Sequence, residues 1–209
     1  MFIGGGYAVA ASPGHMKFVN ELQEIFRGQL ESVAVIMLSY TLTPQARYPR
    51  QLQQGVELLR YLTTTLGKDP SNIILAGDSA GGNLALAVLS HISHPHEAVP
   101  VLELSEPLRG VLLLSPWVSP DTRSSSFTMN ILKDNLVPSV IDRWADAFMG
   151  HTLPDNYNQP YRAPAEWWRD LRADEILVVA GAHEVLIDSI RDWGKKIEVC
   201  DWSRNLYML

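Results

Sequence analysis

Short apolar runs alternate with amphipathic stretches along most of the chain. The runs cover residues 1–3, 32–38, 73–76, 110–114 and 175–180. Each run predicts a strand, because strands of a parallel sheet are covered on both faces and carry few polar side chains. For the run 32–38, which contains β-branched residues, we expect burial on both faces. Strands that alternate with helices predict an α/β fold with a mostly parallel sheet and right-handed crossovers.

Apolar residues at helical spacing occupy the segments between these runs. They predict helices over residues 16–27, 52–66 and 80–92, and a further helix from Leu186 onward. Gly67 follows the second of these helices and is a suitable C-terminal stop.

Residues 115–170 differ from the rest of the chain. Prolines, tryptophans and a serine triplet interrupt any long period there, although residues 138–149 predict one helix. We expect this irregular region to form a cap element or long loops over the strand ends. It would then lie within a single α/β domain of residues 1–209 rather than form a second domain.

Composition narrows the class of protein further. The chain has 209 residues, 46% of them hydrophobic, and a net charge of −6. It has no basic footprint for nucleic acid, no apolar run long enough to cross a membrane and no signal-peptide pattern, so we expect a cytoplasmic location. The single cysteine, Cys200, excludes an internal disulfide. No cofactor is expected, and the oligomeric state stays open.

A Gly-x-Ser-x-Gly turn at residues 77–81 links the apolar run 73–76 to an apolar helix. This context is typical of a nucleophile elbow. A side chain at Gly77 or Gly81 would crowd the turn, so Ser79 is predicted to adopt a strained backbone conformation with its hydroxyl exposed. The N-terminus of the following helix would direct free N–H groups at a developing oxyanion. The alternative is an ordinary glycine–serine turn between a strand and a helix.

Three consecutive glycines at residues 4–6 form a second candidate site. Glycines let backbone N–H groups face an oxyanion without interference from side chains. The alternative interpretation is a phosphate-binding loop, but the chain lacks the Lys-Ser/Thr pair of a P-loop.

The sequence Gly-Asp-Ser-Ala-Gly-Gly at residues 77–82 resembles the elbow of the hormone-sensitive-lipase group of α/β-hydrolases. The glycine triplet, Tyr-x-Leu-x-Pro at residues 40–44 and Ser-Pro-Trp at residues 115–117 are similar to further motifs of that group. Trp167-Trp168 and residues 181–188 resemble a fungal-type branch that includes steryl acetyl hydrolases. The resemblance extends in order from about residue 3 to residue 196.

This resemblance implies a serine hydrolase that acts on carboxylic esters. It implies a nucleophile, a set of backbone oxyanion donors and an acidic triad member, which match Ser79, then Gly5, Gly6 and Ala80, then Glu184. The Trp-rich region suggests a small apolar ester as substrate, although such residues are more often simply core.

Glu184 also has support from its place in the sequence. It follows the predicted strand 175–180, and parallel α/β sheets present site residues at the carboxyl ends of their strands. The alternative is a solvated carboxylate that interacts with a helix dipole, which fits Asp188 better.

Two departures from the family pattern concern histidines. Ile3 stands where the family has a histidine before the three glycines, and residues 185–209 contain no histidine to serve as the base. We therefore expect a chain truncated at both ends, which lacks the opening strands, the closing strand and the catalytic histidine of the family. The remaining histidines are interpreted as surface or packing residues: His15, His91, His94, His96, His151 and His183. The alternative function is a catalytically impaired hydrolase or a pseudoenzyme that binds acyl or sterol-like ligands.

Overall fold

A parallel sheet of four named strands forms the centre of the protein. The computed structural model describes residues 1–28, 33–202 and 206–209. The strands follow one another in chain order, each parallel to the next: β1 (Ile74–Asp78), β2 (Gly110–Leu114), β3 (Ile176–Val179) and β4 (Leu206–Met208). The predicted α/β fold with a parallel sheet is thereby confirmed.

The N-terminal residues extend this sheet beyond β1. Phe2 forms parallel bridges to both Gly77 of β1 and Leu38. The Phe2 N–H donates to the Ala76 carbonyl at 2.7 Å, and the Leu38 N–H donates to the Met1 carbonyl at 3.2 Å. The segment that leads into the glycine triplet therefore lies directly beside the strand that leads into the Gly-x-Ser-x-Gly turn.

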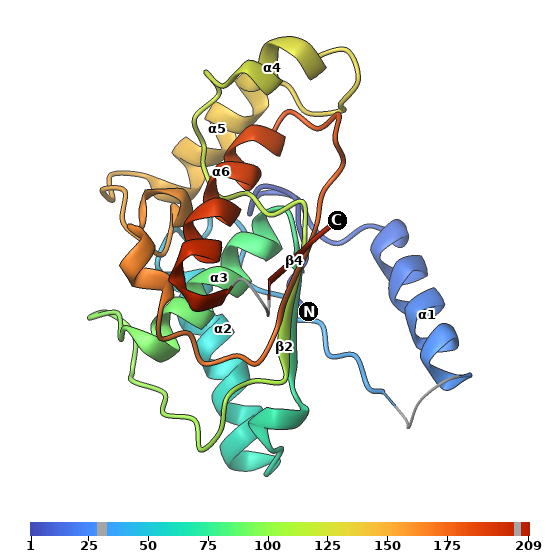
Figure 1. Ribbon diagram of the computed structural model, residues 1–209, viewed down its shortest axis with the longest axis vertical. Coiled ribbons are helices and arrows are strands. Elements are labelled where there is room, and N and C mark those ends of the chain that lie inside the picture. Colours follow the sequence, from blue (N-terminus) through green and yellow to red (C-terminus); the bar gives the residue numbers. More distant parts are fainter. Residues whose placement is uncertain (29–32, 203–205) are drawn as a thin grey trace.

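Helices cover the two faces of the sheet unequally. Figure 1 shows α2 (Arg50–Arg60), α3 (Ala80–Ser93) and α6 (Ile187–Ile197) together on one face, whereas α1 (Pro13–Arg27) stands alone on the other. Within α1 only Val19 is buried. Residues 80–91 of α3 are all buried, as expected for an apolar helix between a sheet and α2.

Strand burial follows this asymmetry. Alternate side chains of β2 and β3, such as Leu113 and Val178, are fully buried, whereas Leu112 and Val179 on the other parity are half-buried. One face of the sheet therefore carries most of the hydrophobic core.

Residues 115–170 contain the remaining α-helices. They are α4 (Ser125–Asn130) and α5 (Pro138–Met149), and the second matches the predicted helix residue for residue. Shorter helical turns occur in this region and elsewhere: a π-helical turn after α2 (Tyr61–Thr65), another after α6 (Glu198–Trp202), and 3₁₀ turns at Pro70–Asn72, Pro160–Arg162 and Ala165–Trp168. Gly67 has a φ of +59°, which confirms it as a left-handed stop residue.

Two expectations from the sequence are corrected by the fold. The closing strand was expected to be missing, but Leu206–Met208 pairs in parallel with β3. The run 32–38 was expected to be buried on both faces, but Val33 and Ile36 are each 43% exposed. The reason is that the described part of this segment, residues 33–38, pairs with the sheet at a single bridge, Phe2–Leu38, rather than along a full strand. Ser32, the start of that predicted strand, and tail residues 203–205 lie outside the described residues.

Among the described residues, no helix is both long and apolar enough to cross a bilayer.

Candidate active site

Ser79 occupies the turn between β1 and α3 with an unusual backbone conformation. Its φ is 51° and its ψ is −116°, so the predicted strained turn is confirmed. A Cβ on Gly77 would lie 2.2 Å from the Gly81 carbonyl oxygen, and one on Gly81 would lie 2.0 Å from the Phe2 carbonyl oxygen. Both contacts are with backbone, which cannot move aside as a flexible side chain would. The glycines are therefore a steric requirement of the turn.

The turn is fixed by backbone hydrogen bonds to neighbouring elements. The Ser79 N–H donates to the Leu114 carbonyl at 2.9 Å, and the Ser79 carbonyl accepts from Asn83 at 3.0 Å and from Trp117 at 2.9 Å. Ala80 is the first residue of α3 and is fully buried. Its N–H belongs to the helix end at which backbone donors lack intrahelical partners.

The glycine triplet turns beside Ser79. A Cβ on Gly4 would lie 3.0 Å from the Ser79 Cβ, which measures how closely the two segments approach. Gly5 and Gly6 have φ values of 117° and 58°, and Tyr7 continues the left-handed run with a φ of 60°. The fold therefore places the start of the glycine loop, Gly4, beside the predicted nucleophile, and the loop has a conformation that glycine adopts most readily.

Asp78 connects this loop to the elbow. Its Oδ1 accepts the Gly4 N–H at 3.0 Å, and its Oδ2 lies 3.5 Å from the Nε2 of His15. The other ring nitrogen of His15 lies 2.9 Å from both the backbone nitrogen and the hydroxyl of Ser12, in a capping box at the start of α1. Both ring nitrogens of His15 therefore have partners, which are Asp78 and the Ser12 cap of α1.

Glu184 lies just beyond the carboxyl end of β3. Its Oε1 accepts the Ser115 hydroxyl at 2.6 Å and the Gly181 N–H at 2.6 Å. Within the described part of the chain, Oε2 has no hydrogen-bond partner. Asp188, the alternative acidic residue, instead accepts the Ser126 N–H at 2.8 Å in the first turn of α6.

Ser79 and Glu184 lie at the same edge of the sheet, and hydrogen bonds to two consecutive residues at the end of β2 link them. Leu114 accepts the Ser79 N–H, and the next residue, Ser115, donates its hydroxyl to Glu184. Ser115 has a positive φ of 45°, a strain that concentrates at functional sites. Ser115 is not among the site residues predicted from the sequence, although its position directly after the predicted strand 110–114 could have indicated one.

The other histidines lie in packing or surface positions, as the sequence predicts. His91 is buried at the far end of α3, between the Pro100 carbonyl and the His96 N–H, and burial lowers its pKa. His94 stacks on Trp167 with ring centroids 4.0 Å apart, and His151 and His183 are exposed. Among the described residues, no histidine side chain forms a hydrogen bond or ion pair with Ser79 or Glu184.

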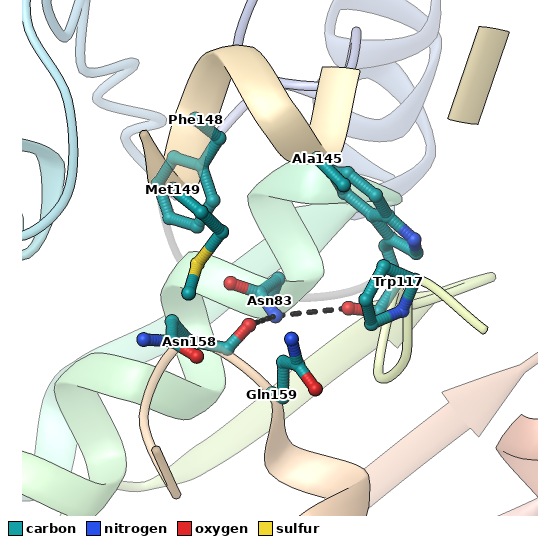
Figure 2. A pocket seen from close by; sticks show the side chains of 8 residues that line it. Asn83, Trp117, Ala145, Phe148, Met149, Asn158 and Gln159 are labelled. Carbon is teal, nitrogen blue, oxygen red and sulfur yellow. Dashed lines mark hydrogen bonds between the residues drawn. The ribbon is translucent and has the colours of Figure 1, made fainter. Parts of the chain in front are cut away.

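A small pocket lies beside the first turns of α3. Figure 2 shows Asn83 at its centre, with Trp117, Phe148 and Asn158 around it, and its cavity volume is about 10 Å³. That volume is close to the minimum for one water molecule. The pocket is lined mainly by residues of the irregular region, so this region closes over the elbow helix.

The arrangement of β1, the strained turn at Ser79 and α3 agrees with the family to which the sequence matches. A profile of the α/β-hydrolase fold matches residues 1–205, and the chain belongs to that family. Its relatives place it more narrowly, among the proteins related to hormone-sensitive lipase.

Steryl acetyl hydrolase 1 of Saccharomyces cerevisiae is 29% identical over 120 residues, which are 56% of this chain and 25% of the yeast protein. An acetyl-hydrolase of Streptomyces hygroscopicus is 27% identical over 190 residues, which are 90% of this chain and 57% of that protein. A crystal structure of an esterase from the bacterial hormone-sensitive lipase family superposes with a TM-score of 0.80 at 26% identity, covering 100% of this chain and 64% of the esterase. The chain thus spans less than two thirds of the length of each relative.

Proposed function

We propose that this chain carries the nucleophile half of a serine esterase, in which Ser79 attacks the carbonyl carbon of a carboxylic ester. The observation that carries this proposal is the strained Ser79 turn, with φ 51°, packed against a left-handed glycine loop. The N–H groups of Gly5, Gly6 and Ala80 would stabilise the oxyanion as negative charge develops on the carbonyl oxygen. The alcohol would then leave, and water would hydrolyse the acyl-enzyme.

Glu184 would serve as the acid that orients a general base. Its Oε1 is held by Ser115 and Gly181, so the carboxylate has a fixed orientation. Its Oε2 is the atom that would accept a hydrogen bond from an imidazole N–H. Residues 185–209 contain no histidine.

A second candidate function assumes that no histidine acts as a base on Ser79. An impaired hydrolase, or a remnant that binds acyl or sterol-like ligands, would retain the elbow and the loop but turn over substrate slowly. Removal of a triad member typically costs on the order of 10⁴-fold to 10⁶-fold in rate. The oxyanion hole and substrate binding alone leave about 10³-fold catalysis over the uncatalysed reaction.

The proposed substrates are small esters with an apolar portion. The relatives named as acetyl hydrolases favour a short acyl group. We further propose that residues 1–209 act as one domain, with residues 115–170 as a cap over the elbow.

Covalent labelling tests the proposal directly. Purified chain is incubated with a fluorophosphonate probe, and intact-mass and peptide spectra locate the adduct. We expect labelling at Ser79, loss of labelling in Ser79→Ala, and unchanged labelling in Ser189→Ala, which removes an α6 hydroxyl that donates to the Leu186 carbonyl. Absence of labelling on the parent chain would reject Ser79 as a reactive nucleophile.

Chemical rescue separates the two candidate functions. Hydrolysis of 4-nitrophenyl acetate is measured with and without added imidazole. We expect imidazole to raise the Ser79-dependent rate by about 10-fold or more, because a diffusible base restores part of the missing general-base catalysis. A Ser79-dependent rate that is already high and insensitive to imidazole would instead show that another group acts as the base. No Ser79-dependent rate in either condition would favour the ligand-binding alternative.

A further inference from the structure

The glycine loop needs external support to hold its donors in place. Residues 5–7 all have positive φ, and a chain of glycines loses more conformational freedom on ordering than other sequences do. The loop makes bonds of its own, from the Ala8 and Val9 N–H groups to the Gly5 carbonyl, both at 2.9 Å. Ile3, which precedes the triplet, has an apolar side chain that cannot hydrogen-bond to the loop.

The first support comes from the residue before the nucleophile. Asp78 is the last residue of β1, and its Oδ1 accepts the Gly4 N–H at 3.0 Å. A carboxylate acceptor makes such a bond stronger than a neutral one. The approach is close enough that a Cβ on Gly4 would lie 2.3 Å from Asp78 Oδ2. Asp78 thus fixes the entry of the glycine loop.

The second support comes from the residue four positions after the nucleophile. Tyr7, at the exit of the loop, donates its hydroxyl to Asn83 Oδ1 at 2.7 Å, and both side chains are at most 2% exposed. The Tyr7 ring also stacks on Phe148 with centroids 3.9 Å apart. Burial raises the pKa of the Tyr7 hydroxyl well above its usual value, so the hydroxyl stays protonated and able to donate.

The Asn83 amide has only one orientation in this network. Its Nδ2 donates to the Trp117 carbonyl at 2.9 Å and to the Asn158 carbonyl at 3.1 Å, which directs Oδ1 at Tyr7 (Figure 2 draws both Nδ2 bonds). A buried polar network with every bond made rigidifies the groups that it joins. Asn83 therefore ties the exit of the loop to α3, to the segment after β2 and to the irregular region.

We propose that Asp78 and Asn83, which lie one position before and four positions after Ser79, are positioning residues that hold the entry and the exit of the glycine loop against the elbow. The inference rests on the proposed function, because the loop is the proposed oxyanion hole. Asp78 holds Gly4 and Asn83 holds Tyr7, so the donors between them, Gly5 and Gly6, are fixed relative to the Ser79 hydroxyl. Neither residue touches the reacting atoms.

The test measures loop order separately from chemistry. Hydrogen–deuterium exchange is followed for residues 4–8, with residues 110–114 of β2 as an internal reference, in Asp78→Ala, Asp78→Asn and Tyr7→Phe. Tyr48→Phe is the matched control, since it removes a hydroxyl from another buried tyrosine, one that donates to Asp155 at 2.8 Å. Thermal denaturation of each variant identifies any that fails to fold.

We expect Asp78→Ala and Tyr7→Phe each to raise the hydrogen–deuterium exchange rate of residues 4–8 by about 10-fold, because each removes one hydrogen bond. The exchange rate of β2 should not change. Asp78→Asn retains an oxygen that accepts the Gly4 N–H, so it should restore much of the protection. Tyr48→Phe should leave the loop unchanged. In 4-nitrophenyl acetate hydrolysis supported by imidazole, the two disruptive variants should lower kcat about 10-fold and leave KM within about twofold, because the loss falls on transition-state stabilisation.

Unchanged exchange in both Asp78→Ala and Tyr7→Phe overturns the proposal, whatever the activity. Raised exchange with unchanged kcat in a chain that hydrolyses esters also overturns it, because the loop would then be held without effect on chemistry. Failure of the proposed function has a different signature, the absence of probe labelling on the parent chain. In that case the exchange data alone decide whether the two residues hold the loop.

Discussion

The candidate site has a nucleophile half around Ser79 and an acid half around Glu184, and the first is more deeply buried than the second. The nucleophile half is enclosed: Gly77 and Ala80 are buried, and a Cβ on Gly77 or Gly81 would meet backbone near 2 Å. The acid half is more open: Glu184 is half-buried, follows an exposed turn and is held by two hydrogen bonds to one oxygen. The nucleophile half is fixed by steric exclusion, whereas the acid half is fixed by a few polar contacts.

This difference indicates which part of a serine-hydrolase site can persist without the rest. The strained turn at Ser79 depends on β1, α3 and residues 1–3, and these elements contribute Phe2, Leu75 and much of α3 to the hydrophobic core. Loss of a base would leave the turn intact, because folding and not catalysis maintains it. The carboxylate of Glu184 has no comparable structural reason to keep its position.

The largest effect is expected from Gly81→Ala. The added Cβ would lie 2.0 Å from the Phe2 carbonyl oxygen, so the N-terminal segment or α3 must move. We expect a loss of more than about 3 kcal/mol in the free energy of unfolding, at the upper end for overpacking. That corresponds to a fall of roughly 6–12 °C in Tm, measured by calorimetry.

Gly14→Ala is the matched control for this substitution. Gly14 occupies the second position of α1, as Gly81 does in α3, but its nearest contact would be the Ser12 hydroxyl at 3.4 Å. We expect a small gain in stability, since alanine is the better helix former. If Gly81→Ala were as harmless as Gly14→Ala, the steric account of the nucleophile half would be wrong.

Sequence analysis predicted the elements whose signals are local. The helix Pro138–Met149, the stop at Gly67 and the strained turn at Ser79 all depend on residues within a few positions of one another. It failed where burial or pairing depends on distant segments. The tail gave no strand signal because Leu206–Met208 has only three residues, and β3 supplies the pairing.

The same division applies to the candidate site. Glycines that must be glycine can be identified from sequence, because the turn itself demands them. The partners of Tyr7 and Glu184 could not be identified, because Asn83 and Ser115 are separated from them by 76 and 69 positions. Such contacts are set by the order of strands in the sheet, which places the loops after Ile3, β1, β2 and β3 at one edge.

An intermediate effect is expected from Glu184→Ala. The substitution removes the acceptor of the Ser115 hydroxyl and the Gly181 N–H, so we expect a loss of about 1–2 kcal/mol in the free energy of unfolding. Glu184→Gln retains an oxygen acceptor and should cost less than about 1 kcal/mol. Urea denaturation of both variants measures the difference.

The pair also tests the role of Glu184 in the proposed chemistry. Both variants should lower the imidazole-supported rate of ester hydrolysis, because neither provides a negative charge to orient the ring. Ser79 labelling by a fluorophosphonate should change little in Glu184→Gln, because the elbow does not depend on this side chain. A collapse of labelling in Glu184→Gln would show that the two halves are coupled, contrary to the comparison.

The smallest effect concerns the far end of α3, where His91 anchors the helix that begins at the nucleophile. Its Nε2 lies 3.2 Å from the Pro100 carbonyl, and its Nδ1 accepts the His96 N–H at 3.0 Å, an arrangement that requires the neutral ring. Burial is the main cause that lowers the His91 pKa below its usual 6.5, with smaller contributions from His96 and Arg60. The stability from the neutral ring is therefore complete above pH 6.5 and is lost as the pH falls through the lowered pKa.

We expect acidification from pH 7 to pH 5 to reduce the free energy of unfolding by up to about 1 kcal/mol through this site, the net value of one hydrogen bond. His91→Asn places a non-titrating oxygen near the Nδ1 position and should flatten this part of the pH dependence, whereas His183→Asn at an exposed position should not. Chemical denaturation at pH 5, 6 and 7 measures all three chains. If the free energy of unfolding of His91→Asn had the same pH dependence as that of the parent chain, the stability of α3 would not depend on a neutral His91. Apolar packing would then hold the far end of this helix.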